Sequence, residues 1–422
     1  MPLETRLPGA RRALLLLLAV NLFNYIDRYI LAAVLPDIRK AFFAPDDPAA
    51  MGKMGLLFTV FLVSYMLLAP LFGWLADRSS RWLLAGIGVA VWSLASGASG
   101  LAGSFVILLM TRVFVGIGEA GYGPAAPTLI ADYFPESVRG RVLSYFYLAI
   151  PVGSALGFVF GGVVGNALGW RWPFYLVTVP GLVLAVLCCL MQEPRKLLAR
   201  NAGNRPVALP FWEGLRGLLR NRSYLYNTAA MTAMTFAIGG ISAWVPTYIH
   251  EYRGQPDLGQ INTIFGAITV VSGIFATLSG GLLADRVKRR HPGAYFLVSG
   301  TGMLIAFPLL VVMLFTPFPW FWVMLFLVEF FLFFNTGPAN AALVNVTAPS
   351  IRATAFAVNI FVIHALGDAI SPPLIGAIAD RWQMNVAFLA VSAMIAIAGL
   401  FWFWGAKFLE SDTRAVADFT KS

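Results

Sequence analysis

Six charged residues interrupt long apolar stretches of this 422-residue chain: Asp27, Arg28, Arg112, Glu119, Glu329 and Asp368. A charge at the centre of a lipid bilayer costs at least about 2.5–3.5 kcal/mol, so such residues are functional candidates if these stretches cross a membrane. Removal from water favours the neutral, protonated form of a carboxyl group, whereas a neighbouring arginine favours the ionised form. A carboxyl group beside an arginine can therefore bind and release a proton, and the arginine can hold an anionic group.

Four of these residues lie at related depths in the first half of the chain. At 1.5 Å per residue, Asp27 and Arg28 lie about 11–12 Å before Leu35 at the outer end of the first run. Arg112 lies about 12 Å after Ser104, at the outer start of the fourth. Glu119 follows on the same helix face, two turns on. We expect Asp27, Arg112 and Glu119 to form a proton-coupling site, with Arg28 as a bidentate anion clamp. The alternative is a salt-bridge cluster that only holds these helices together.

The second half of the chain carries fewer charges inside its apolar runs. Glu329 must face away from lipid, either to contact a substrate or to pack as a protonated acid. His364 and Asp368 are four residues apart, a spacing that suits a proton relay or a polar link between helices. The expected substrate-binding residues are Arg28, Arg112, Glu119 and Glu329.

The composition explains why so few charges are present. Hydrophobic residues make up 59% of the chain and charged residues 12%, against about 25% charged in soluble domains. This excludes a soluble globular enzyme and a disordered protein. The net charge of +10 fits basic cytoplasmic loops, so we expect no nucleic-acid partner. The sequence contains no phosphate-binding glycine loop, metal-ligand cluster or nucleophile elbow, so we expect no cofactor, no metal and no enzymatic activity.

Twelve apolar runs are long enough to cross a bilayer. They cover residues 13–35, 54–75, 82–104, 106–131, 141–165, 173–192, 223–249, 260–284, 294–315, 319–345, 353–377 and 386–408. Of the 30 Lys and Arg residues, 22 lie on the side of the two termini and 6 on the other. The positive-inside rule then predicts a multi-pass membrane protein with both termini in the cytoplasm. The first run is too long for a signal peptide.

A polar, basic segment at 193–222 separates six runs from six. It predicts an N-terminal six-helix bundle at 1–192, a cytoplasmic linker at 193–222 and a C-terminal six-helix bundle at 223–422. The amphipathic piece at 211–219 lies on the membrane surface or is plain linker.

A repeated motif follows the second and eighth runs. Gly73-Trp-Leu-Ala-Asp77-Arg78-Ser-Ser-Arg81 matches Gly281-Leu-Leu-Ala-Asp285-Arg286-Val-Lys-Arg289, 208 residues later. Two copies in register indicate duplicated halves. The motif resembles the signature loop of the major facilitator superfamily, over essentially the whole chain. The resemblance implies an all-α polytopic membrane protein of twelve transmembrane helices in two pseudo-symmetric six-helix bundles, which rock to give alternating access.

The same resemblance implies a set of gating residues. Asp132, at the inner end of the fourth run, is the expected partner of the basic residues in the 77–81 loop. The full gating set is Asp77, Arg78, Arg81, Asp132, Asp285, Arg286 and Arg289.

Within the superfamily, Asn24-Tyr-Ile-Asp27-Arg28 with Arg112…Gly116-Ile-Gly118-Glu119-Ala120 resembles the Spinster family, linked to lysolipid and sphingoid-phosphate export. This implies proton-coupled transport of an amphipathic lipid by Asp27, Arg28, Arg112 and Glu119. Organic-anion and cation symporters carry a similar first run, so a proton-coupled symporter of a small organic acid is the alternative. A non-transporting membrane receptor or scaffold is a third possibility. The short N-terminus and compact loops look bacterial, and we expect a monomer in the inner membrane, with protons and membrane lipids as partners.

Overall fold

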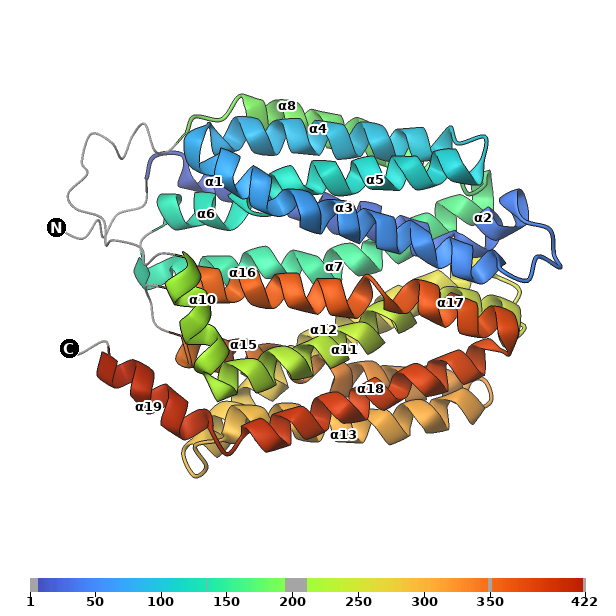
Figure 1. Ribbon diagram of the computed structural model, residues 1–422. Coiled ribbons are helices and arrows are strands. Elements are labelled where there is room, and N and C mark those ends of the chain that lie inside the picture. Colours follow the sequence, from blue (N-terminus) through green and yellow to red (C-terminus); the bar gives the residue numbers. More distant parts are fainter. Residues whose placement is uncertain (1–6, 135, 194–210, 348–350, 420–422) are drawn as a thin grey trace. The chain divides into compact units, whose positions relative to one another are not determined.

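The described part of the chain folds almost entirely into α-helices (Figure 1). The computed structural model describes residues 7–134, 136–193, 211–347 and 351–419. The helices of the first half are α1 (Ala10–Ala33), α2 (Leu35–Phe42), α3 (Ala50–Arg78), α4 (Arg81–Gly100), α5 (Phe105–Tyr122), α6 (Ala125–Tyr133), α7 (Glu136–Leu168) and α8 (Trp172–Cys189). Those of the second half are α10 (Phe211–Arg220), α11 (Arg222–Thr247), α12 (Leu258–Lys288), α13 (Ala294–Phe315), α14 (Trp320–Phe333), α15 (Thr336–Asn345), α16 (Arg352–Ile363), α17 (Ser371–Arg381), α18 (Met384–Gly405) and α19 (Leu409–Phe419). Two π-helical turns, η2 (Tyr248–Tyr252) and η3 (His364–Asp368), continue α11 and α16.

Twelve helical segments of the described chain are long and apolar enough to cross a membrane, which confirms the predicted runs. Large apolar side chains such as Leu67 and Phe315 are exposed, as expected for helices surrounded by lipid. A short turn separates the third run from the fourth. There Ser104 caps α5, because its hydroxyl accepts a hydrogen bond from the Ile107 N–H at 3.3 Å.

Three of the predicted runs are interrupted rather than continuous. The run at 106–131 breaks between α5 and α6 at Pro124, and the run at 319–345 breaks between α14 and α15, just before Pro338. Proline lacks an N–H and its ring clashes with the carbonyl four residues earlier, which explains both breaks. The eleventh run bends at Gly367, whose φ of −105° and ψ of −106° lie outside the helical region.

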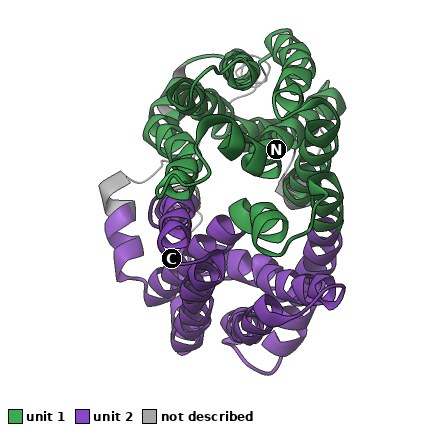
Figure 2. Cartoon of the chain, turned by 90° about the vertical axis from the view of Figure 1, so that its right-hand side faces the viewer, with its two compact units in different colours: residues 1–204, 243–267 green, residues 205–242, 268–422 purple. Residues whose placement is uncertain are grey.

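The described residues fall into two compact units (Figure 2). The first contains the described parts of 1–204 together with 243–267, and the second contains those of 205–242 and 268–422. The chain of α11 and of α12 therefore passes from one unit to the other. Most of the predicted linker, residues 194–210, lies outside the described residues, and its last part forms helix α10.

Glycines fix the position of α1, the helix that carries Asp27 and Arg28. Within the first unit α1 packs along α7, and α4 packs along both α5 and α8. A Cβ atom at Gly157 of α7 would lie 2.6 Å from the Ile26 carbonyl oxygen, and one at Gly161 would lie 3.1 Å from the Ile30 Cα. Only glycine permits this close approach of the two backbones. Gly157 and Gly161 therefore hold in place the part of α1 that carries Asp27 and Arg28.

Candidate functional site

An ion pair inside the membrane-spanning region joins α1 to α5. Nη2 of Arg28 lies 2.5 Å from Oε2 of Glu119, whose side chain is 2% exposed. The Arg28 side chain is 22% exposed, so the pair is enclosed on the Glu119 side and open on the arginine side. Charge-assisted bonds of this length are strong in a medium from which water is excluded.

Asp27 contacts a different helix from its neighbour Arg28, because the side chains of successive residues in a helix point about 100° apart. The Ser96 hydroxyl of α4 donates a hydrogen bond to Oδ1 of Asp27. Its other oxygen, Oδ2, is buried and has no hydrogen-bond partner in the described part of the chain. Sequence reasoning missed Ser96, although Ser93, Ser96 and Ser99 recur every three residues on one face of α4.

Arg112 is the most deeply buried member of the group, with 1% exposure. Among the described residues it forms no ion pair, and its Nε and Nη1 atoms have no hydrogen-bond partner. Its guanidinium lies 5.6 Å from the ring centre of Phe61, and that of Arg28 lies 4.8 Å from the same ring. The two cations therefore share one aromatic side chain of α3 by cation–π contact. Nothing in the sequence singled out Phe61.

The four side chains carry balanced charges. Two carboxylates and two arginines sum to zero when all are ionised, and one added proton makes the group a net cation. An unbalanced buried charge is costly, so protonation favours the binding of an anionic group in the same place. This arrangement can couple a proton to an anion without a metal or a cofactor.

Glu329 forms a polar link between α14 and α12 in the second unit. The Thr269 hydroxyl donates to Oε1 of Glu329 at 3.1 Å, and the Ser272 hydroxyl donates to Oε2 at 3.0 Å. Both carboxyl oxygens are thus occupied by hydroxyl donors of one neighbouring helix.

His364 and Asp368 also lie together. Nδ1 of His364 is 2.9 Å from Oδ1 of Asp368 and 3.1 Å from Oδ2. Both residues belong to η3, where the helix bends at Gly367.

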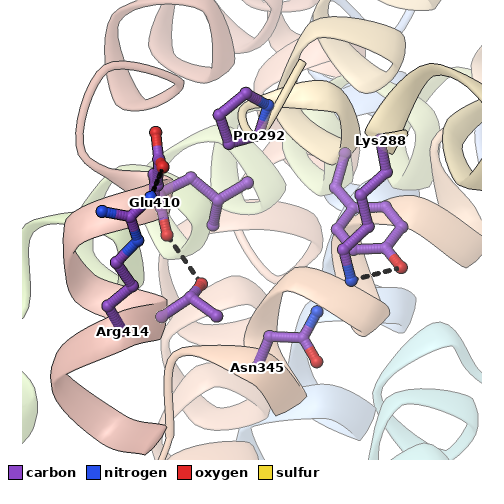
Figure 3. A pocket seen from close by; sticks show the side chains of 8 residues that line it. Lys288, Pro292, Asn345, Glu410 and Arg414 are labelled. Atoms are coloured by element: carbon purple, nitrogen blue, oxygen red, sulfur yellow. Dashed lines mark hydrogen bonds and ion pairs between the residues drawn. The ribbon is translucent and has the colours of Figure 1, made fainter. Parts of the chain in front are cut away.

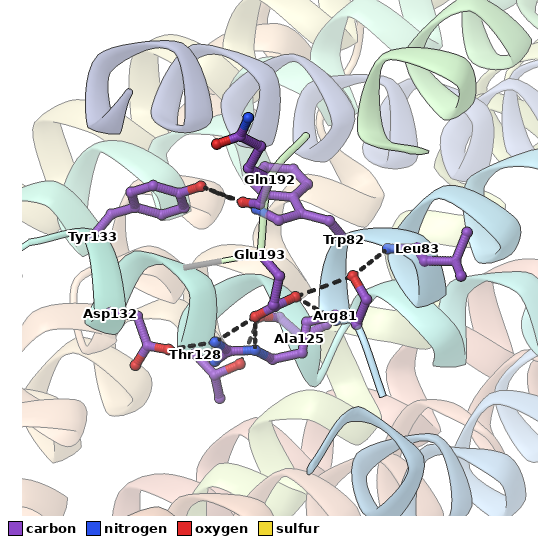
Figure 4. A network of polar contacts seen from close by, with 10 residues as sticks. Arg81, Trp82, Leu83, Ala125, Thr128, Asp132, Tyr133, Gln192 and Glu193 are labelled. Atoms are coloured by element: carbon purple, nitrogen blue, oxygen red, sulfur yellow. Dashed lines mark hydrogen bonds and ion pairs between the residues drawn. The ribbon is translucent and has the colours of Figure 1, made fainter. Parts of the chain in front are cut away.

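Arg81 of the first motif copy lies in a buried polar network (Figure 4). It pairs with Asp132, the partner that the family resemblance implied, and with Glu193, whose Oε1 lies 2.9 Å from Nη2. The Arg81 backbone N–H donates to Oε2 of Glu193 at 2.7 Å, so this acid also caps α4. Burial alone would raise the pKa of Glu193, but the hydrogen bonds and charge of Arg81 outweigh burial and lower it.

Two other members of the motif, Asp77 and Arg78, lie in α3, but the structure does not describe their side chains. Sequence reasoning assigned Glu193 to the linker and missed its role. The one feature of the sequence that could have indicated this pairing is that Glu193 is the first acidic residue after the sixth run.

The second motif copy has different contacts. Asp285 accepts a hydrogen bond from the Tyr295 hydroxyl at 3.1 Å, and the same hydroxyl accepts one from Lys288 at 3.4 Å. Arg286 and Arg289 are exposed. The 208-residue offset that relates the two copies carries Asp132 to Asn340, so the second half lacks the matching acid.

A surface pocket of about 230 Å³ lies beside this second copy (Figure 3). Lys288, Pro292 and Asn345 line it, together with Glu410 and Arg414, which pair with each other. It contains none of the expected substrate-binding residues.

A further ion pair lies in the first unit, beyond the end of α1. Nη1 of Arg39, on α2, is 2.8 Å from Oε2 of Glu251, on η2. Nearby, the Asn262 amide donates to the Ala33 carbonyl oxygen at 3.1 Å. These contacts explain why residues 243–267 group with the first unit, and sequence reasoning did not predict them.

Known proteins resemble this chain over nearly its whole length. Residues 17–372 match the family described as the Major Facilitator Superfamily. Protein spinster homolog 1 of Xenopus laevis is 36% identical over 439 aligned residues, covering 96% of this chain and 82% of that protein. The human protein spinster homolog 1 is also 36% identical, covering 97% of this chain and 83% of that protein.

A solved structure shares the fold. It is a bacterial homolog to the human lysosomal transporter Spinster, in an inward-facing and unoccupied conformation. It matches with a TM-score of 0.84 at 22% identity, covering 97% of this chain and 99% of that chain. The twelve helices therefore form the major facilitator fold, a fold of transporters rather than enzymes. By its sequence and its fold, the chain belongs to the Spinster family of the Major Facilitator Superfamily.

Proposed function

We propose that this protein is a proton-coupled secondary transporter that works by alternating access and carries a lysolipid or sphingoid-type amphipathic molecule. The observation that carries the proposal is the intramembrane ion pair of Arg28 and Glu119, with Asp27 and Arg112 close by. Such charges are costly in lipid and are kept where they bind ions or substrates.

The coupling follows from the contacts of Glu119. A proton on Glu119 removes the charge that holds Arg28, and the freed guanidinium can then form a bidentate contact with a phosphate. Arg112 supplies a second positive charge that no described acid pairs with. The net charge of the group returns to zero when the anionic headgroup binds, which predicts one proton for each single negative charge.

The second unit supports a substrate with a single charged end. The buried arginines among the described residues are Arg81 and Arg112, both in the first unit. A small organic acid with two charged groups would need a second buried cation, and the described residues of the second unit contain no buried arginine. Glu329 is an expected substrate contact, although both its oxygens already accept hydroxyl hydrogen bonds in this conformation.

The rocking bodies of the proposed cycle are the six-helix halves 1–192 and 223–422, joined by the linker 193–222. Arg81 and Asp132 hold the gate of the first half together with Asp77 and Arg78, and Asp285, Arg286 and Arg289 serve the second half. The protein is a monomer in a bacterial cell membrane, and both termini face the cytoplasm, where the basic residues gather. Substitution of Asp77 should slow conformational exchange more than it weakens substrate affinity.

The test is transport in proteoliposomes with an imposed pH gradient. A thermal-shift screen of lysolipids, sphingoid phosphates and small organic acids, at two pH values, first identifies a ligand. The ligand should then be accumulated in wild type when the pH gradient is imposed. Glu119→Gln should keep counterflow but lose its pH dependence, because glutamine cannot be ionised.

Three results would contradict parts of this proposal. Retained proton coupling in Glu119→Gln would remove Glu119 from the coupling site. If only small organic acids raise the melting temperature in the screen, the alternative substrate class is favoured. Absence of counterflow for every ligand that binds would favour a receptor over a transporter.

A further inference from the structure

A small polar cavity lies next to Asp27, between α1, α4 and α8 of the first unit. Asp27, Trp92 and Ser93 line it, together with Ser96 and Gly181. The space open to the centre of a water molecule is about 10 Å³, which is the smallest volume that holds one water.

Two buried oxygens of this lining have no hydrogen-bond partner in the described chain. They are Oδ2 of Asp27 and Oγ of Ser93, and each residue is 3% exposed. Buried polar atoms are nearly always hydrogen-bonded, to protein or to ordered water. A cavity of the size of one water, with two unsatisfied oxygens in its wall, meets the conditions for a structural water.

We infer that one buried water binds in this cavity, bridges Oδ2 of Asp27 and Oγ of Ser93, and exchanges a proton with Asp27, one of the two carboxyl groups of the proposed coupling site. This inference rests on the proposed proton coupling for its second part only. Transfer to Asp27 breaks an O–H bond of the protonated water and forms one at Oδ2, which leaves a neutral water. Release reverses both changes.

The chemistry of the neighbours favours this assignment. The charged groups that act on Asp27 are Arg112 and Glu119 of α5 and Arg28 of α1 itself, while α4 contributes the Ser96 hydroxyl. An arginine only donates hydrogen bonds, so it cannot accept one from the O–H of a protonated carboxyl group. Water and serine both donate and accept, so they can satisfy Asp27 with and without its proton.

The glycines between α4 and α8 provide a matched pair of variants. A Cβ atom at Gly181 would meet Oγ and Cβ of Ser93, so Gly181→Ala fills the cavity. Combining it with Ser93→Ala removes the closer contact, with Oγ, leaves the contact with Cβ at 2.9 Å, and keeps the cavity filled. A Cβ atom at Gly97 would meet the Thr178 hydroxyl at the same helix interface, and neither residue lines the cavity. Gly97→Ala is therefore the control for an added methyl group.

The presence of the water is tested by X-ray radiolytic labelling of the purified full-length protein. Bound water yields hydroxyl radicals that oxidise adjacent side chains even when these are buried. Trp92 is 2% exposed and lines the cavity, whereas Trp402 is 0% exposed and does not. Trp92 should be oxidised several-fold faster than Trp402 in wild type and Gly97→Ala, and at the Trp402 rate in Gly181→Ala and in the double variant.

Equal labelling of the two tryptophans in wild type, or no change of Trp92 labelling in the filled variants, would overturn the water site.

The proposed proton exchange between the water and Asp27 is tested by transport. The double variant should slow uptake driven by a pH gradient several-fold, with counterflow affinity at fixed pH unchanged. Equal slowing in Gly97→Ala, or none in the double variant, would overturn this exchange. If wild type shows no proton coupling, the proposed function fails while the labelling result stands.

Discussion

The two most deeply buried arginines of the described chain differ in their partners. Arg81 pairs with Asp132 and Glu193, whereas Arg112 has no described ion pair and lies near the Phe61 ring. A buried arginine with two acids stabilises the fold, and its removal leaves uncompensated charges. A buried arginine that lacks such an acid is costly to the fold and is more readily explained by a ligand.

This difference predicts the behaviour of two alanine variants. Arg81→Ala should destabilise the protein by about 3–5 kcal/mol, the typical loss when one partner of a buried ion pair is removed. Arg112→Ala should abolish transport with a much smaller change in melting temperature in detergent. A fall in melting temperature as large as that of Arg81→Ala would instead show that the charges of this group only hold the helices together.

At the level of single elements, the start of α4 depends on an acid from the end of the sixth span. Glu193 accepts hydrogen bonds from the Arg81 side chain and from its backbone N–H. Because Arg81 lowers the pKa of Glu193 below its usual 4.5, the ionised acid stabilises the fold above about pH 4.5. That contribution is lost as the pH falls through the lowered value.

A comparison of melting temperatures at several pH values measures this contribution. Glu193→Gln should melt lower than wild type at pH 7, and the difference should shrink as the pH falls below 4.5. Glu410→Gln, which removes an exposed pair with Arg414, is the control and should have little effect at either pH. A difference that stays constant with pH would contradict the role given to the ionised acid.

The contact between α12 and α14 depends on Glu329. Glu329→Leu removes the hydrogen bonds that Glu329 accepts from the hydroxyls of Thr269 and Ser272, at a cost of about 0.5–1.5 kcal/mol for each bond. The melting temperature should fall, and Glu329→Gln should recover much of it because its carbonyl oxygen still accepts one hydrogen bond. The KM for the substrate, measured on Glu329→Gln in proteoliposomes, then distinguishes a substrate contact from a packed, protonated acid. A raised KM at unchanged stability would establish a substrate contact.

Across the whole molecule, charged contacts lie at both ends of α1 within the first unit. The Arg81 network lies near its start, where the Leu7 N–H bonds to the Tyr133 carbonyl oxygen at 3.2 Å. Arg39 and Glu251 pair beyond its end. The 24 residues of α1 separate these contacts by about 36 Å, at 1.5 Å per residue. Glu251 lies on the continuation of α11, a helix whose first part belongs to the second unit.

The Arg39–Glu251 pair should therefore favour one conformation of an alternating-access cycle. Arg39→Glu should increase labelling of a cysteine at Asn24 by a membrane-impermeant thiol reagent added from outside. Labelling is measured in variants with Cys188 and Cys189 replaced by alanine. The exchanged pair Arg39→Glu with Glu251→Arg should return labelling toward the wild-type rate. Unchanged labelling in Arg39→Glu would show that the pair does not bias the cycle.

The order of apolar runs, the repeated motif and the identities of the intramembrane charges can all be predicted from the sequence. Twenty apolar residues have few ways to cross a bilayer, and the cost of an unpaired charge there marks Asp27, Arg28, Arg112 and Glu119 by residue type and position alone. The four-residue spacing of glycines in α7 indicates a close helix contact, and the structure identifies α1 as the partner. These features depend on residue type and on separations along one helix.

Partner choice depends on the packing of helices that are far apart in the chain. The seven-residue spacing of Arg112 and Glu119 placed them on one helix face, but only the rotation of α1 against α5 decided that Glu119 pairs with Arg28. The same packing gave Asp27 its Ser96 partner, placed Phe61 beside two cations, and recruited Glu193 to Arg81. Sequence by itself determined which charges the membrane must accommodate, because burial cost is a property of each residue. Tertiary structure alone decided which charges meet, because a contact within 3 Å is set by helix rotation and register that no local pattern encodes.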